Sequence, residues 1–226
     1  MAIVSCPAGT GKRGRTLDAL LAALQSLLLE PGAGAFSIGD VCERAGVAQG
    51  TFYNYADSID ELVEGLAALL SASLAALGGS APSAKADPIA AFVFKTRQTL
   101  GISVHAPEYG RLIFDSGLPV DRLLAHLRKD LEGDIRLGAA AGVFKTSNPA
   151  LSASMVAGCM LGVGLDLHRK VLPRSAIETA TAEMLVMLGV ARSLVQRATA
   201  IRIRFAAPPA LPLRWLALIS SEGASP

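Results

Sequence analysis

Residues 36–55 read FSIGDVCERAGVAQGTFYNY, and this stretch decides the fold of the chain. Ser37 is a preferred helix N-cap, and the carboxylate of Asp40 can accept a hydrogen bond from the Ser37 amide, which is a shortened capping box. The sequence therefore predicts a helix that starts at Ile38 and ends at a glycine turn, followed by a second short helix over residues 49–55. Two short helices around a glycine turn are typical of a DNA-reading helix-turn-helix.

Two longer amphipathic helices flank this stretch. Thr16 is predicted to cap the first, which the Pro-Gly pair at residues 31–32 ends. Its apolar stripe consists of Leu17, Leu20, Leu24, Leu27 and Leu28. The other is capped at residues 57–58 and is predicted to continue to about residue 77. Residues 16–66 are therefore predicted to form one small helical domain, and its last helix extends beyond it.

The quoted stretch resembles the DNA-binding domain of the TetR family of transcriptional regulators. The resemblance rests on an Ala-Gly-Val turn at residues 45–47, a Gly-Thr-Phe-Tyr helix at residues 50–53 and a Glu-Leu pair at residues 61–62, within about residues 14–66. It implies a ligand-responsive regulator, a repressor, that binds double-stranded DNA at a palindromic operator as a homodimer. A small apolar or aromatic effector would release it.

The N-terminal side chains of a short recognition helix reach base edges, so Gln49 and Thr51 are predicted to read bases. Tyrosine and serine hydroxyls are expected on phosphates, and Phe52 in the small core. The whole predicted DNA-binding set is Lys12, Arg13, Arg15, Ser37, Gln49, Gly50, Thr51, Tyr53, Asn54 and Tyr55. Two positions depart from the family pattern: Ala56 replaces an aromatic residue, and Ile59 replaces a lysine that binds a phosphate. We therefore expect a shallow salt dependence of DNA binding.

Composition and charge set further limits. The 226 residues are 51% hydrophobic and only 5% aromatic, with a mean hydropathy of +0.44, which favours an all-α protein with a sizeable core. Residues 1–66 carry four basic and eight acidic side chains, although a DNA-binding domain is expected to be basic. This charge motivates an alternative, a helical protein-interaction module that has lost strong DNA binding.

The N-terminus is predicted to be a flexible basic arm over residues 1–15. Its Cys6–Arg13 stretch is similar to a phosphate-binding P-loop, but it lacks the first glycine and the Ser/Thr that would hold Mg²⁺. The three cysteines, Cys6, Cys42 and Cys159, form no metal-binding pattern and are expected to be reduced thiols. No signal peptide is recognised, which predicts a cytoplasmic protein. No metal or cofactor is predicted either.

Residues 80–199 are predicted to form a helical ligand-binding and dimerisation domain. Its expected helices cover residues 88–104, 107–116, 120–141, 147–171 and 174–198, with a break at Gly189 in the last. The last two are apolar nearly all round, so they are expected to be buried. By the resemblance they pair two subunits, whereas by composition they could equally form the monomer's own core. The apolar run at residues 151–165 is too short to cross a membrane.

The same domain holds the predicted ligand site, where the resemblance places a pocket between helices. The candidates are mostly apolar with a few polar groups, as ligand sites usually are. They are Phe94, Arg97, His105, Tyr109, Met155 and Cys159. Residues 200–226 are predicted to be a poorly ordered tail packed on the surface, with a strand-like alternation at residues 201–205.

The sequence contains little that supports an enzyme active site. Gly101-Ile-Ser103-Val-His105 begins like a nucleophile elbow, but a histidine occupies the place of the second glycine and no strand precedes it. A small hydrolase that uses Ser103 and His105 is therefore a weaker alternative, and no enzyme activity is predicted.

Overall fold

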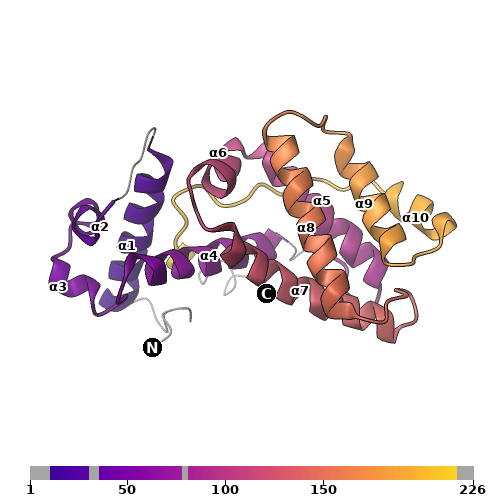
Figure 1. Cartoon of the computed structure of the whole chain (residues 1–226), viewed down its shortest axis with the longest axis horizontal. Helices are drawn as coiled ribbons and strands as arrows, with labels where there is room; N and C mark the ends of the chain where they lie inside the picture. The colour runs from indigo at the N-terminus through magenta and orange to yellow at the C-terminus, as the bar shows by residue number, and fades with distance from the viewer. Residues whose placement is uncertain (1–10, 31–35, 78–80, 218–226) are drawn as a thin grey trace. The chain divides into compact units, whose positions relative to one another are not determined.

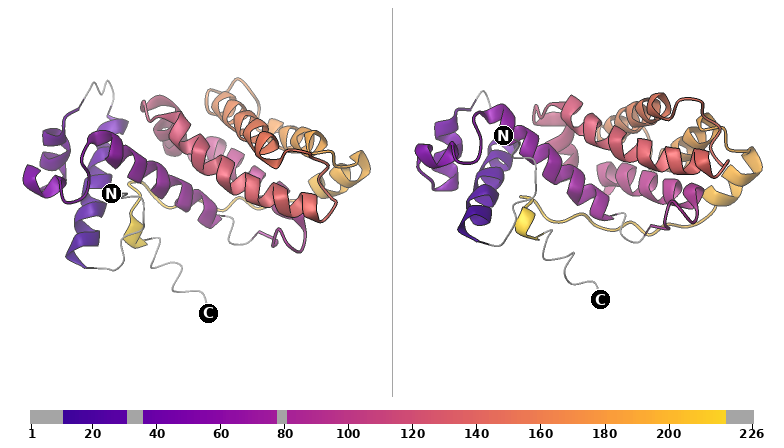
Figure 2. Two further views of the ribbon diagram at one scale, coloured as in Figure 1. Left: turned by 60° about the horizontal axis from the view of Figure 1, so that its bottom comes forward. Right: turned by 90° about the horizontal axis from the view of Figure 1, so that it is seen from below.

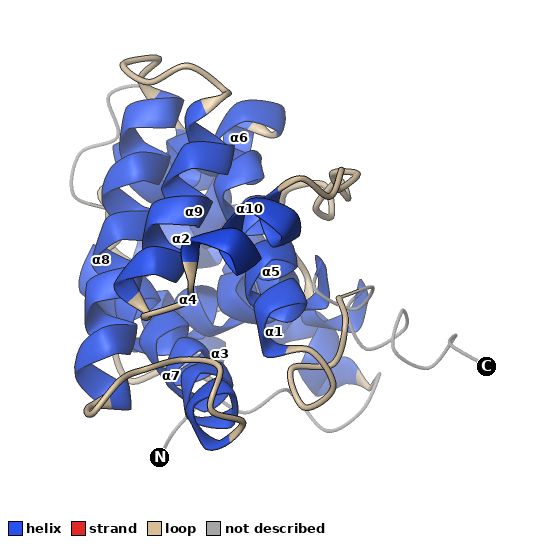
Figure 3. Cartoon of the chain, turned by 90° about the vertical axis from the view of Figure 1, so that its right-hand side faces the viewer, coloured by secondary structure: helices blue, strands red, loops and turns tan. Residues whose placement is uncertain are grey.

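The computed structural model describes residues 11–30, 36–77 and 81–217, and all regular structure in these ranges is helical (Figures 1 and 3). The all-α prediction is therefore confirmed. The chain forms two compact units. The first consists of Met1–Ser73, Arg111–Leu123 and Pro209–Pro226, and the second of Leu74–Gly110 and Leu124–Pro208.

Helix α1 (Lys12–Leu29) begins four residues before the predicted cap. Gly11 is its N-cap, and the Thr16 hydroxyl donates to the Lys12 carbonyl at 3.1 Å inside the helix. A hydroxyl bonded within a helix no longer caps it, and Lys and Arg are good helix formers. The predicted cap at Thr16 is therefore wrong, and the basic cluster assigned to a flexible arm is the first turn of α1. Residues 1–10 of that arm lie outside the described residues.

Helix α2 (Ile38–Ala45) has the predicted ends. The Ser37 amide donates to the Asp40 carboxylate at 2.6 Å and the Asp40 amide donates to the Ser37 hydroxyl at 3.3 Å, which completes a capping box. Gly46 ends the helix with a φ of 67°, a conformation that favours glycine. Helix α3 (Gln49–Phe52) is shorter than predicted, because residues 53–55 continue as turns.

The packing of the first unit follows from these ends. Helix α2 packs against α1 and α3 against α2. Phe52 on α3 is fully buried, and the leucine stripe of α1 is buried with it, both as predicted. The predicted helix end at residues 31–32 lies outside the described residues.

Helix α4 (Ile59–Ala76) closes the helix-turn-helix. The Ser58 hydroxyl accepts a hydrogen bond from the Glu61 amide at 3.2 Å, and the Glu61 carboxylate accepts one from the Asp57 amide at 2.8 Å. The Ser58 cap was predicted, whereas Asp57 contributes its main-chain amide and not the side-chain cap that was expected. Its last turn belongs to the second unit from Leu74 onward. The predicted loop between the domains begins at residues 78–80, outside the described residues.

The remaining helices follow the predicted order with two divisions. They are α5 (Pro88–His105), α6 (Pro107–Gly110), the π-helical turn η2 (Arg111–Asp115), α7 (Val120–Ala140), α8 (Pro149–His168), α9 (Ala176–Met187) and α10 (Arg192–Thr199). The helix predicted over residues 107–116 is thus divided into α6 and η2. Gly189, with a φ of 75°, separates α9 from α10 at the predicted break.

Side-chain caps position α5 and α8. The Asp87 carboxylate accepts from the Ala90 amide at 2.9 Å, and the Asn148 side chain accepts from the Leu151 amide at 3.0 Å. Proline occupies the first turn of both helices, where its missing N–H has no consequence. Helix α5 packs against both α8 and α9, and α10 lies beside α9 (Figures 1 and 2).

Gly138 on α7 is a close contact in the core of the second unit. A Cβ atom there would lie 2.2 Å from the Phe144 ring, which is itself buried edge-on against Phe92. Gly138→Ala is therefore expected to lower the free energy of unfolding by about 1–3 kcal/mol. Gly133→Ala on the same helix meets nothing within 4 Å and should raise it by about 0.5–1 kcal/mol. Urea denaturation would measure both, and equal effects of the two changes would contradict this packing.

The C-terminal segment, residues 200–217, differs most from expectation. It was predicted to be a loosely packed tail, but buried side chains hold its main chain, and no strand is assigned at residues 201–205. In the second unit the side-chain amide of Gln98 makes two hydrogen bonds to this segment. Its nitrogen donates to the Arg204 carbonyl at 2.7 Å, and its oxygen accepts from the main-chain N–H of Ala206 at 3.0 Å. A side-chain amide thus takes the place of a partner strand.

The first unit holds the end of the same segment in the same way. The Gln25 side chain donates to the Leu213 carbonyl at 3.0 Å and accepts from the Leu213 amide at 2.7 Å. The Asp18 carboxylate accepts from the amides of Trp215 and Leu216 at 2.7 and 3.2 Å. Asp18 and Gln25 are both buried on α1, so the C-terminal segment completes the core of this unit. Residues 218–226 lie outside the described residues.

Candidate functional site

The turn and short helix after Gly46 present a polar, exposed surface. Gln49 and Gly50 open α3 and are exposed, and Tyr53 has 58% of its surface exposed. A Cβ atom on Gly50 would meet nothing within 4 Å. Asn54 is also exposed, whereas Thr51 and Tyr55 are half-buried. The fold thus leaves the first turn of α3 open to a partner, as a recognition helix requires.

The basic first turn of α1 lies next to this surface. Lys12, Arg13 and Arg15 are exposed, and the Arg13 guanidinium lies 5.9 Å from the centroid of the Tyr55 ring. Cations in the first turn of a helix oppose the helix dipole, so they do not serve helix stability. The structure therefore brings Arg13, in the first turn of α1, to Tyr55 at the end of the predicted recognition segment.

Five of the eight acidic side chains of residues 1–66 accept backbone hydrogen bonds or pair with an arginine. The Asp18, Asp40 and Glu61 carboxylates accept backbone hydrogen bonds, and those from Ser37 lower the pKa of Asp40 below its usual value. Glu30 pairs with Arg44 at 2.6 Å, and Glu64 with Arg122 of the same unit, also at 2.6 Å. The pairs with Arg44 and Arg122 neutralise two of the eight negative charges in this stretch.

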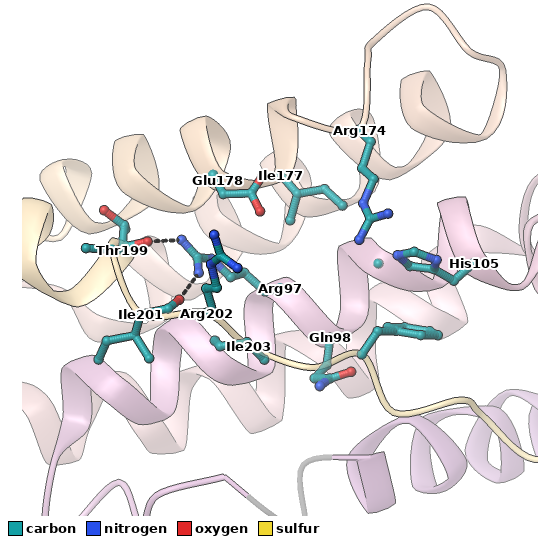
Figure 4. A pocket seen from close by; sticks show the side chains of 13 residues that line it. Arg97, Gln98, His105, Arg174, Ile177, Glu178, Thr199, Ile201, Arg202 and Ile203 are labelled. Atoms are coloured by element: carbon teal, nitrogen blue, oxygen red, sulfur yellow. Dashed lines mark hydrogen bonds between the residues drawn. The ribbon is translucent and has the colours of Figure 1, made fainter.

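The second unit contains a cleft of about 400 Å³, which we call the arginine cleft (Figure 4). It lies between α5, the start of α9 and the segment that follows α10. Its lining is Arg97, Gln98, Gly101, His105, Arg174, Ile177, Glu178, Thr199, Ala200, Ile201, Arg202, Ile203 and Phe205. A cavity of this size can hold a small ligand.

Arg97 forms the base of the arginine cleft. It is 8% exposed, and its two terminal nitrogens donate to the carbonyls of Ile201 and Thr199 at 2.7 and 2.6 Å (Figure 4). Burial lowers the pKa of Arg97, and the nearby Glu178 carboxylate raises it. The remaining nitrogen, Nε, is buried and has no hydrogen-bond partner among the described residues.

His105 lies at the other end of the arginine cleft. Its ring stacks on Phe205 with the centroids 4.6 Å apart, and burial and the positive charge of Arg174 lower its pKa. A lowered pKa leaves the imidazole neutral at pH 7. Arg97 and His105 are thus the two predicted ligand residues that this cleft brings together.

The other four predicted ligand residues do not line the arginine cleft. Phe94 is half-buried elsewhere on α5, and Tyr109 is fully buried, which together with the Glu108 charge raises its pKa. Met155 and Cys159 are exposed on α8. Sequence reasoning missed Arg174, Glu178 and Arg202 as a cluster, because no local pattern links them to Arg97.

The Ser-His pair of the hydrolase alternative is not assembled. Ser103 and His105 are two residues apart on α5, and side chains at that spacing do not face each other on a helix. A nucleophile elbow also requires a preceding strand, whereas Ser103 lies within a helix. Within the described ranges, no group of three or more His, Cys, Asp or Glu side chains could hold a metal ion.

Helix α8 is less buried than predicted. Its inner face is buried, but Leu151 and Met155 have 56% and 48% of their surfaces exposed. Gly158 and Gly162 are exposed beside them, with nothing within 4 Å of a Cβ atom. In the described part of the chain, α8 is the one helix whose length and composition would suffice to span a membrane, a test that helices of soluble proteins also pass.

Solved structures share this fold. RolR without ligand superposes with a TM-score of 0.64 at 20% identity, over 84% of this chain and 99% of that one. RolR in complex with resorcinol gives 0.64 at 20% identity, over 87% and 98%. A putative TetR-family transcriptional regulator from Syntrophomonas wolfei gives 0.59 at 17% identity, over 85% and 98%. No curated protein sequence matches the chain.

The chain combines an N-terminal helix-turn-helix unit with a second helical unit, and it shares this fold with the solved structures above. Residues 20–66 match the sequence profile described as bacterial regulatory proteins of the tetR family. Residues 20–66 of this chain therefore form a DNA-binding domain of the tetR family of bacterial regulatory proteins.

Proposed function

We propose that the chain is a cytoplasmic homodimeric repressor that binds a palindromic operator and is released from it by a small molecule. The observation that supports DNA binding most is the placing of the basic first turn of α1 against the recognition segment through Arg13 and Tyr55. Phosphate contacts position a protein on DNA and base contacts specify the sequence, and this surface offers groups for both.

The exposed residues of the recognition segment have distinct roles in this proposal. Gln49 and Thr51 read base edges, and the open position at Gly50 lets the DNA backbone approach closely. The hydroxyls of Ser37, Tyr53 and Tyr55 contact phosphates together with Asn54, and Lys12, Arg13 and Arg15 supply positive charge.

The protein-interaction alternative depended on the net negative charge of residues 1–66. Five of the eight carboxylates there, those of Asp18, Glu30, Asp40, Glu61 and Glu64, accept backbone hydrogen bonds or pair with arginines. Two of these charges are neutralised by arginine partners, and Arg13 of α1 lies against Tyr55 of the recognition segment. We therefore favour DNA over a protein partner for this surface.

The outer face of α8 is the proposed dimer surface. Leu151 and Met155 supply exposed apolar area, and Gly158 and Gly162 allow the backbone of another helix to come close. A twofold axis would bring the same face of both subunits together, as in most homodimers. This assignment also accounts for an apolar helix that is only one-third buried within one chain.

The proposed effector site is the arginine cleft. RolR, which shares the fold, has been solved with resorcinol bound, and small-molecule control is proposed here on that analogy. A ligand releases DNA only if it binds the DNA-incompetent conformation more tightly. Residues 199–205, just after α10, form one wall of this cleft. The end of the same C-terminal segment is hydrogen-bonded to α1 of the first unit. The segment therefore offers one covalent route by which ligand binding could affect DNA binding.

Gly158→Arg tests the dimer and DNA binding together. The change should leave each monomer folded, because its Cβ meets nothing within 4 Å, yet it places a charged side chain between the subunits. We expect the dimer dissociation constant to rise by about 100-fold or more, with matching loss of the complex with DNA upstream of the protein's own gene. Sedimentation and gel-shift titrations would measure both.

The matched control is Gly133→Arg on α7, which is also exposed and without neighbours within 4 Å of its Cβ. It should remain dimeric and bind DNA as the wild type does. A Gly158→Arg protein that stays dimeric would reject the α8 surface, and a wild-type protein that prefers no DNA over random competitor would reject the function.

A further inference from the structure

We propose that the arginine cleft binds a small organic acid with a flat apolar body, such as an aromatic carboxylate. Its carboxylate would lie among Arg97, Arg174 and Arg202, and its ring would lie against Phe205. The inference rests on the proposed function in treating this cleft as the effector site, and it adds the chemical class of the ligand.

The lining of the arginine cleft has an excess of positive charge. Three guanidinium groups line the cleft and only one carboxylate, that of Glu178, accompanies them (Figure 4). Among the described residues, neither Arg174 nor Arg202 forms an ion pair with a carboxylate, whereas Lys95 and Arg136 of the same unit do. Like charges gathered in a cavity repel one another, and an anion relieves this repulsion. The cleft therefore selects for negative charge.

The base of the cleft is a buried cation. Arg97 is more than nine-tenths buried, and two of its nitrogens hold the Ile201 and Thr199 carbonyls. Neither acceptor carries a full negative charge, and the Nε donor has no partner among the described residues. The Glu178 carboxylate acts on Arg97 without forming an ion pair with it, so a bound carboxylate supplies the paired countercharge that Arg97 lacks.

The cleft also has apolar walls. Ile177, Ile203 and Phe205 line the same cleft, and the neutral His105 ring stacks on Phe205 at 4.6 Å. Aromatic rings offer a flat surface on which another ring can stack. A volume of about 400 Å³ has ample room for a one-ring acid.

The test uses 4-fluorobenzoate and its uncharged counterpart 4-fluorobenzamide as probes, with ¹⁹F NMR line broadening on the full-length protein. The two probes have the same ring and nearly the same size, so a difference between them reports charge. We expect 4-fluorobenzoate to bind about tenfold more tightly, equal to about 1.4 kcal/mol. Equal affinities, or no broadening of 4-fluorobenzoate at about 5 mM, would overturn the inference.

Variants locate the binding. Arg174→Gln and Arg202→Gln remove exposed cations that make no hydrogen bond among the described residues, so both proteins should fold normally. Each is expected to weaken 4-fluorobenzoate binding by about fivefold or more, whereas Arg192→Gln, an exposed arginine on α10 that does not line the cleft, should have no effect. Unchanged binding in both cleft variants would place the probe elsewhere and overturn the inference.

Failure of this inference is separable from failure of the proposed function. DNA binding is measured without any probe, so a protein that binds its operator but shows no preference for the carboxylate loses only the ligand class. A protein that prefers the carboxylate but binds no specific DNA keeps the ligand class and loses the regulator.

Discussion

Replacing Gln25 with leucine is expected to lower the free energy of unfolding by about 2–4 kcal/mol. The Gln25 side chain is fully buried and satisfies both the amide and the carbonyl of Leu213, at 2.7 and 3.0 Å. Leucine fills a similar volume but leaves both groups without a partner. Each buried, unpaired main-chain group costs about 1–3 kcal/mol, so the loss exceeds that of an ordinary surface change.

Urea denaturation followed by tryptophan fluorescence measures this effect directly. Trp215 is the single tryptophan of the chain, and its amide is held by Asp18 next to the site of the change. The control is Ser26→Ala, since the Ser26 hydroxyl bonds only the Ala22 carbonyl of its own helix and its loss should change stability by less than about 0.5 kcal/mol. Equal stability of the two variants would mean that Gln25 does not hold the C-terminal segment.

Gln49→Ala is expected to weaken specific DNA binding by about 1–3 kcal/mol and to relax the preference at one base pair. The side chain is exposed at the first residue of α3, and its amide can pair with an adenine edge in the major groove. Because the residue is exposed and holds no cap, the change should leave the fold intact. Fluorescence anisotropy titrations with operator and single-base variants would measure the effect.

Arg15→Ala is the contrasting change in the same unit. Arg15 lies in the first turn of α1, so its loss should weaken binding to all DNA sequences alike and lower the salt slope by about one. Ile59→Lys, at the first residue of α4, should instead tighten binding by adding the missing phosphate contact. If Gln49→Ala weakened operator and random DNA equally, its side chain would read no base.

The helix-turn-helix could be predicted from the sequence because its signals are local. The Ser37–Asp40 cap, the Gly46 turn and the buried Phe52 each depend on residues within one turn of a helix or two. The same holds for Asp87 and Asn148, which cap α5 and α8 from positions just before a proline. Local capping chemistry is readable from one sequence since it needs no knowledge of distant contacts.

The C-terminal segment could not be predicted, because its order comes from residues nearly 200 positions away. Gln25 and Leu213 are 188 residues apart, and no periodicity in residues 200–217 indicates that a buried glutamine will satisfy them. Several prolines and an alternating apolar pattern are equally compatible with a loose tail. The first unit is assembled from three separate stretches of chain for the same reason.

Two of the six predicted ligand residues line the arginine cleft, the proposed effector site. Arg97 and His105 on α5 were chosen for their polarity within an apolar helix, and both line the arginine cleft. Met155 and Cys159 were chosen on an apolar helix that was expected to be buried, but they lie on its exposed face. An apolar helix reads the same in sequence whether its apolar face meets its own chain or a second copy.

The central claim is that the chain is a dimeric, sequence-specific DNA-binding regulator, and selection of bound oligonucleotides from random double-stranded DNA by the full-length protein tests it most directly. The account predicts enrichment of one palindromic consensus whose half-sites lie about 34 Å apart, or a multiple of one helical turn. Enrichment should disappear with Gly158→Arg, and Gln49→Ala should lose preference at symmetric positions in both half-sites. Recovery of no consensus, or of one without twofold symmetry, would contradict the claim.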